Sequence, residues 1–194
     1  TQMIVKGHDF PNVTLVGVLA ADLSLYTGDY RASERTFQLL TQAAGRAGRG
    51  REEGIAVIQT YSPDHYGIEA AAAQDYGMFF ERELSYRQLM EYPPAAHLLA
   101  VYLTHTDKDG LERGADRLKE LLLKQADGRE VSIIGPADAY VAKINDIYRK
   151  VVYLKSREME ELLFMKEETE LFCREDTVIG QLNIQFDMDP MNGF

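Results

Sequence analysis

Two adjacent prolines divide this chain of 194 residues near its middle. Tyr92-Pro93-Pro94 follows a stretch with helical spacing, and consecutive prolines end a helix and force an extended backbone after it. The sequence on each side is long enough for a small domain. We therefore expect two domains, residues 1–92 and residues 93–194.

The first half alternates between strand and helix patterns. The β-branched run Val13–Leu19 predicts a buried strand of a parallel sheet, and Ile55–Thr60 predicts a second strand. Ser33 is a candidate N-cap for a helix between them. The expected helices cover 33–44, 67–74 and 78–91. The order strand, helix, strand indicates a crossover within an α/β layer.

The second half begins with a strand pattern and contains two amphipathic helices. Along the chain we expect a strand, a helix, two strands, a helix and a strand, at 96–104, 111–124, 131–134, 147–154, 158–173 and 181–187. This βαββαβ order is typical of a small α/β domain. The fold class predicted for the whole chain is therefore α/β.

Composition excludes some classes of protein. The formal net charge of −10 argues against a surface that coats nucleic acid generally, although Lys143–Arg157 contains five basic residues and one acid. The apolar runs are too short for a membrane span. The one cysteine, Cys173, excludes an internal disulfide, and we expect a cytoplasmic location. Cys173 lies in a helical stretch beside Leu171 and Phe172, so we expect a buried thiol. The sequence begins with Thr1 rather than with Met, and we expect it to be a piece of a longer protein.

An arginine-bearing motif, Gln42-Ala43-Ala44-Gly45-Arg46-Ala47-Gly48-Arg49, follows the helix of the first half. Arginine is a permanent cation that binds phosphate in a bidentate way, so two arginines three positions apart suit a polyphosphate. Gly45 and Gly48 would let the backbone turn so that Arg46 and Arg49 point the same way. The alternative is a solvated basic turn.

Two other features of the first half are candidates for ligand contacts. In the segment before the first strand, Thr1 and Lys6 could contact phosphates, and Gly7 permits a close backbone approach. Asp22 follows that strand, at the carboxyl end where ligands bind in parallel sheets, or it caps a turn.

The basic stretch of the second half is a candidate binding surface. Arg149, Val151, Tyr153 and Lys155 would share one face of a strand, and Tyr148 offers a ring for stacking beside a cation. An acidic peptide with a hydrophobic end could also dock here through charge complementarity. The alternative is a solvated strand edge that lysines protect against aggregation.

The chain carries TQMIVKGHDFPNVTLVGVLAAD, QAAGRAGR and GIAVIQTYSPDH, which together resemble the PriA family of bacterial replication-restart helicases, of superfamily two. The resemblance continues through Tyr92-Pro93-Pro94, Gly135-Pro136-Ala137, Tyr148-Arg149 and Asp187–Pro190, and so covers essentially the whole chain.

The resemblance implies an ATP-dependent 3′-to-5′ DNA helicase that acts at stalled forks and in primosome assembly. Its expected partners are forked or single-stranded DNA, single-stranded-DNA-binding protein, primosome proteins and the loader of the replicative helicase. Residues 1–92 would be part of a second RecA-like helicase lobe, and residues 93–194 a C-terminal domain that binds DNA and single-stranded-DNA-binding protein. The location would be the nucleoid.

Site residues also follow from the resemblance. Arg46 and Arg49 carry over as γ-phosphate arginines, and Gln42 and Gly45 as residues of the nucleotide site. The residues expected to contact DNA or a partner are Thr1, Lys6, Gly7, Tyr148, Arg149, Lys155 and Arg157.

The chain lacks two motifs that the resemblance would require for ATP turnover. It contains no GxxxxGK[ST] phosphate loop and no DExH metal-binding sequence. The resemblance implies ATP, Mg²⁺ and zinc as cofactors of the full-length protein. Because the two motifs are missing we expect no activity from the chain alone, and because the chain has one cysteine we expect no metal site in it. The alternatives are a non-catalytic module that binds DNA or single-stranded-DNA-binding protein, and part of a RecG-like translocase.

Overall fold

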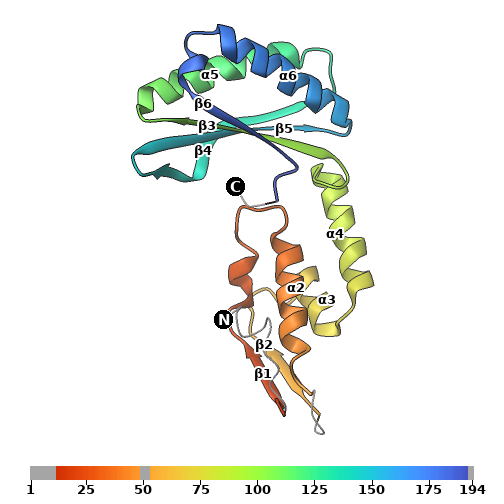
Figure 1. Cartoon of the computed structure of the whole chain (residues 1–194). Helices are drawn as coiled ribbons and strands as arrows, with labels where there is room; N and C mark the ends of the chain where they lie inside the picture. Colours follow the sequence, from red (N-terminus) through yellow and green to blue (C-terminus); the bar gives the residue numbers. More distant parts are fainter. Residues whose placement is uncertain (1–11, 49–52, 192–194) are drawn as a thin grey trace. The chain divides into compact units, whose positions relative to one another are not determined.

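The computed structural model describes residues 12–48 and 53–191, which form two compact units (Figure 1). The first unit extends to Tyr86, and the second begins at Arg87, within helix α4 (Tyr76–Met90). Each unit combines helices with a β-sheet, which confirms the predicted α/β class. The domain limit expected between residues 92 and 93 stays a prediction.

The first unit contains a parallel pair of strands, β1 (Leu15–Val18) and β2 (Ile55–Ile58). The chain passes between them through the short 3₁₀ helix η1 (Ala21–Ser24) and helix α2 (Ala32–Ala44), so the predicted crossover is confirmed. Helices α3 (Tyr66–Ala73) and α4 follow β2, within a few residues of their predicted positions.

The core of the first unit lies on one face of the two-stranded sheet. Phe37 of α2 stacks on Phe79 of α4 at 4.3 Å between ring centroids, and Val18 and Ile58 pack against the same cluster. The other face is open: the exposed fraction is 64% for Leu15. The prediction of a buried strand is therefore wrong for this face, because no described helix covers it.

The predicted cap of α2 is also wrong. The N-cap position is Arg31 and makes no side-chain capping bond, while Ser33 lies inside the first turn. Asp29 organises the approach to the helix instead, because its Oδ1 accepts a hydrogen bond from the Arg31 amide at 2.9 Å. The helix begins earlier than the serine signal indicates.

The second unit has the predicted βαββαβ order. Its elements are β3 (His97–His105), α5 (Lys108–Gln125), β4 (Ser132–Ile144), β5 (Ile147–Ser156), α6 (Met159–Glu175), a 3₁₀ helix η2 (Ile179–Gln181) and β6 (Asn183–Met188). The sheet order is β4-β5-β3-β6, and all neighbouring strands are antiparallel. Strand β5 lies between β3 and β4, which is the split βαβ arrangement of ferredoxin-like domains.

Helices α5 and α6 lie on one face of this sheet (Figure 1). Alternate residues of the central strands face them, so Leu99 of β3 and Val152 of β5 are fully buried beside Leu118 of α5 and Leu162 of α6. Burying one such side chain contributes about 1.5–3 kcal/mol. This cluster fixes the direction in which every other residue of β5 points.

Strand β4 is much longer than the sequence predicts. It continues through Gly135-Pro136 to Ile144, with register shifts between Ile134 and Ala137 and between Asp138 and Lys143. Proline is compatible with this position because β4 is an edge strand, where a missing amide donor costs little.

Candidate functional site

The arginine motif forms a tight turn directly after α2. The Arg46 amide donates to the carbonyl oxygen of Ala43 at 3.1 Å, which prolongs the last turn of the helix. The Gly48 amide then donates to the carbonyl oxygen of Val13 at 2.9 Å, just before β1. The turn is thus fixed between the end of a helix and the start of a strand.

The glycines of the turn have different roles from those predicted. Gly45 has an ordinary helical φ of −64°, whereas Gly48 has a φ of 76° and supplies the left-handed residue. Gly54, to which the sequence interpretation assigned no role, permits the close packing: a Cβ there would lie 2.0 Å from the Gly48 nitrogen. Its only signal in the sequence is a glycine directly before a strand.

The structure describes part of the predicted nucleotide site. Arg46 is half-buried in the turn, and Gln42 is exposed on α2. Arg49 lies outside the described residues, as do Thr1, Lys6 and Gly7. A joint orientation of Arg46 and Arg49 therefore stays a prediction.

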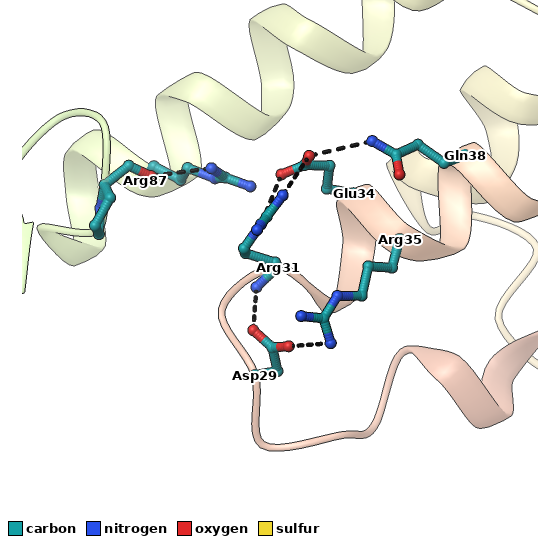
Figure 2. Close-up of polar contacts among 7 residues, drawn as sticks. Asp29, Arg31, Glu34, Arg35, Gln38 and Arg87 are labelled. Carbon is teal, nitrogen blue, oxygen red and sulfur yellow. Dashed lines mark hydrogen bonds and ion pairs between the residues drawn. The ribbon is translucent and has the colours of Figure 1, made fainter. Parts of the chain in front are cut away.

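An ion-pair cluster that the sequence interpretation missed holds the start of α2 (Figure 2). The Asp29 carboxylate, almost fully buried, pairs with Arg35 Nη1 at 2.5 Å. Arg31 Nη2 pairs with Glu34 Oε1 at 3.1 Å, and Gln38 Nε2 donates to the same oxygen at 3.2 Å. This cluster could have been predicted from the spacing of Arg31, Glu34 and Gln38 at positions i, i+3 and i+7, which places them on one face of a helix. The cluster fixes the helix whose other end carries the arginine turn.

Asp22 fits the turn-capping alternative. Its carboxylate accepts hydrogen bonds from Thr60 Oγ1 at 2.5 Å and from the amides of Tyr61 and Ser62 at 2.9 and 3.1 Å. The Thr60 bond is the main cause that lowers the pKa of this carboxyl, followed by the Tyr61 amide. The side chain thus connects the segment after β1 with the segment after β2.

In the second unit, β5 places its side chains on two faces. Arg149, Val151, Tyr153 and Lys155 alternate with the buried Val152 and Leu154, so the predicted shared face is confirmed. Tyr148 is on the opposite, helix-covered face and packs partly against the core, with Lys143 Nζ 4.8 Å from its ring centroid. Tyr148 and Arg149 therefore belong to different faces of the sheet.

Lys155 has a structural partner that its position in the sequence does not reveal. Its Nζ donates to the carbonyl oxygen of Met90, the last residue of α4, at 2.9 Å, and lies 3.7 Å from the Tyr92 ring centroid. A lysine at this place caps a helix C-terminus. Burial lowers the pKa of Lys155, and the nearby Glu91 opposes that effect.

Arg157 is at the end of β5 and remains accessible. Its Nε lies 3.6 Å from Glu91 Oε1, and 68% of its side chain is exposed. Both Lys155 and Arg157 line a recess of about 430 Å³ between the end of β5, the start of β4 and the end of α4.

Two negative findings apply to residues 12–48 and 53–191. No three His, Cys, Asp or Glu side chains in these ranges lie close enough together to hold a metal ion. No helix in them is long and apolar enough to cross a membrane.

These features define a two-unit α/β protein in which a helix ending in an arginine turn precedes a ferredoxin-like domain. The chain belongs to the PriA family: residues 88–191 match the family described as the primosomal protein N C-terminal domain.

Curated relatives with the name replication restart protein PriA match nearly the whole chain. The protein of Bacillus subtilis (strain 168) is 38% identical over 98% of this chain, and that of Synechocystis sp. is 36% identical over 99%. The chain spans about a quarter of these relatives, 24% and 22% of their length. Among solved structures, the de novo designed protein Foldit4 matches half of this chain and 99% of its own, with 9% identity and a TM-score of 0.39.

Proposed function

We propose that this chain is part of an ATP-dependent 3′-to-5′ DNA helicase that restarts replication at stalled forks. The names of the relatives support the role in replication restart. The arginine turn after α2 is the single observation that supports the helicase chemistry, because backbone hydrogen bonds hold the segment that carries Arg46 between the end of a helix and the start of a strand. The sequence itself contains no phosphate loop. The chain would then supply one half of a divided ATP site.

In this proposal Arg46 and Arg49 stabilise the negative charge that develops on the transferred γ-phosphoryl group. Gln42 and Gly45 would contribute to the same nucleotide site from the end of α2. The phosphate loop and the residues that hold Mg²⁺ would come from another lobe of the complete protein, and a zinc site from a further segment.

The open face of the first unit supports an incomplete helicase lobe. Leu15 and Ile55 are both 64% exposed and lie opposite each other on β1 and β2, and Val57 on the same face is 54% exposed. Parallel sheets are normally covered on both faces. We infer that β1 and β2 belong to a larger RecA-like sheet.

The second unit would bind nucleic acid and proteins of the primosome. Arg149 on β5 and Arg157 directly after it carry positive charge. Tyr148 offers a ring beside Lys143 on the opposite face of the sheet. Forked or single-stranded DNA, single-stranded-DNA-binding protein and the loader of the replicative helicase are the partners that we propose. The site of action would be the nucleoid.

Replacement of the turn arginines tests the proposal. In the full-length protein, Arg46→Ala and Arg49→Ala should each reduce DNA-stimulated ATP hydrolysis by about 10³-fold or more, while DNA binding persists. Arg82→Ala is a matched control, because Arg82 is an exposed arginine of the same unit that pairs with Glu69 at 2.8 Å. Steady-state turnover measures the effect, and the 194-residue chain alone should show none.

Two results would contradict the divided site. Near-normal turnover of the Arg46 and Arg49 variants would leave a non-catalytic binding module as the better interpretation. Appreciable ATP hydrolysis by the chain alone would show that it contains a complete site.

A further inference from the structure

Helix α6 carries apolar side chains on both of its sides. Leu162 and Met165 are fully buried against the sheet, whereas Leu163 and Leu171 are 44% and 56% exposed. Helix α5 covers the same face of the sheet; all its residues are described, and Leu123 is the only exposed leucine among them. The outward side of α6 is therefore more apolar than that of its neighbour. The exposed residues of α6 are Glu160, Leu163, Phe164, Glu167, Glu168, Leu171, Arg174 and Glu175.

The outward side of α6 is also negatively charged. Four of its exposed residues are glutamates and one is an arginine, which leaves three negative charges. Two other glutamates of the helix are neutralised, because Glu161 pairs with Arg129 at 2.7 Å. Glu170 pairs with Lys166 at 2.6 Å. None of the four exposed glutamates forms an ion pair with another residue of the described ranges, so their charges are available to a partner.

Apolar and acidic residues alternate along this side of the helix. Leu163, Glu167 and Leu171 follow one another at intervals of four residues, which places them on one face. The two leucines are about 12 Å apart along the helix axis, at 1.5 Å per residue. Phe164 lies beside Leu163 but already has a partner, because the Arg129 guanidinium lies 3.8 Å from its ring centroid. We call Leu163, Glu167 and Leu171, with the flanking exposed glutamates, the acidic face of α6.

We propose that the acidic face of α6 binds an amphipathic helix of a partner protein, in which basic residues lie beside apolar ones. A helix repeats apolar side chains on one side every three to four residues, so a partner helix of a few turns reaches both leucines. Lysine or arginine side chains next to that apolar stripe would pair with Glu167 and the flanking glutamates. The partner is thus recognised by shape and by charge together.

The charge of the acidic face disfavours other classes of ligand. Nucleic acid and acidic peptides carry negative charge and would be repelled. A second copy of this chain would bring the glutamates of two α6 helices together. A basic amphipathic helix is the class for which the apolar contacts and the charges both favour binding.

This inference goes beyond the proposed function and does not depend on it. The acidic face contains neither the arginine turn nor the basic strand. ATP turnover of the Arg46→Ala variant reports on the divided nucleotide site, whereas peptide binding reports on α6, so the two proposals can fail separately.

Peptide binding to the 194-residue chain tests the acidic face. The probe is a fluorescent peptide of about 18 residues, roughly five helical turns, in which leucines recur with helical spacing among lysines. A peptide of the same composition, in an order that breaks this spacing, should bind at least about fivefold more weakly in fluorescence anisotropy. Leu171→Gln and Glu167→Lys should each weaken binding of the helical peptide about tenfold, because each removes a contact that defines the face.

Helix α5 supplies matched controls. Leu123 is 54% exposed, against 56% for Leu171. Asp116 is exposed on α5 and, like Glu167, forms no ion pair with another described residue. Leu123→Gln and Asp116→Lys therefore make the same chemical changes outside the acidic face, and each should change affinity by less than about twofold. Urea unfolding of the four variants should match that of the parent chain, because all four side chains are exposed.

The outcomes separate the possible partners. Losses confined to the α6 variants and to the helical peptide would support the acidic face as the site. Equal losses for the α5 and α6 variants would show attraction to the overall negative charge and would overturn it, as would equal binding of the two peptides. Binding of an oligothymidylate that Leu171→Gln weakens would replace the protein partner with nucleic acid. Dimerisation that Leu171→Gln abolishes in sedimentation would assign the face to a second copy instead.

Discussion

His65 shows how one side chain sets the start of an element in the first unit. Its Nδ1 accepts a hydrogen bond from the Gly67 amide at 3.1 Å, which caps α3, and its ring stacks on Tyr66. Desolvation by burial lowers the pKa of His65 below its ordinary 6.5, while the carboxylates of Glu83 and Asp22 oppose this shift. The imidazole is therefore neutral at pH 7, as the capping bond requires.

The pH dependence of stability tests this capping role. Because the folded pKa of His65 is below 6.5, the unfolded chain binds the proton more readily, and the free energy of unfolding should fall as the pH decreases below about 6.5. His65→Asn keeps an N-cap acceptor that does not titrate and should flatten this part of the curve. Urea unfolding at pH 5 to 7 measures it, and equal slopes for both proteins would contradict the assignment.

The two helices of the second unit begin differently. Asp107 caps α5, because its Oδ2 accepts a hydrogen bond from the Gly110 amide at 2.8 Å. Glu158 occupies the same position before α6 but makes no side-chain capping bond. The start of α5 therefore depends on its N-cap side chain, whereas the start of α6 depends on packing against the sheet.

This contrast gives a prediction with an internal control. Asp107→Ala should lower the free energy of unfolding by about 1 kcal/mol, whereas Asp107→Asn should retain most of it. Glu158→Ala should change stability by less than about 0.5 kcal/mol. Denaturant unfolding followed by circular dichroism compares the three variants, and equal losses at Asp107 and Glu158 would show that the capping bond has no net effect.

At the scale of elements, periodicity predicted the helices and the alternating faces of β5, because both depend on residues close in the sequence. The extension of β4 past Gly135-Pro136 was not predictable locally, since proline is accepted only where the strand is an edge, and neighbouring strands decide that. The partner of Lys155 was hidden for the same reason: the Met90 carbonyl is 65 residues away. The arginine turn could be located, but its dependence on Gly54 required the structure.

At the scale of the whole molecule, the two units differ in how completely they bury their sheets. The second unit encloses one face of four strands under two helices, whereas the first exposes Leu15, Ile55 and Val57 on one side of two strands. A net charge of −10 disfavours association, but an exposed apolar sheet face promotes it.

Polar substitutions on this face test which effect dominates. Ile55→Thr together with Val57→Thr keeps β-branched side chains and should reduce self-association with little change in the free energy of unfolding. Light scattering at increasing protein concentration measures the effect. Val152→Thr is the control, because it places a hydroxyl in the fully buried core and should destabilise by about 1–3 kcal/mol. Unchanged association in the double variant would exclude the face as the contact.

The contact between Gly54 and the arginine turn also limits how the family can evolve. Any side chain at position 54 would clash with the backbone nitrogen of Gly48. A second mutation cannot relieve this clash, because every residue at position 48 has a backbone nitrogen. Substitution there would require a compensating change in the path of the turn itself. Position 54 should therefore be among the least tolerant sites in a saturation screen, although glycine has no side chain that could take part in chemistry.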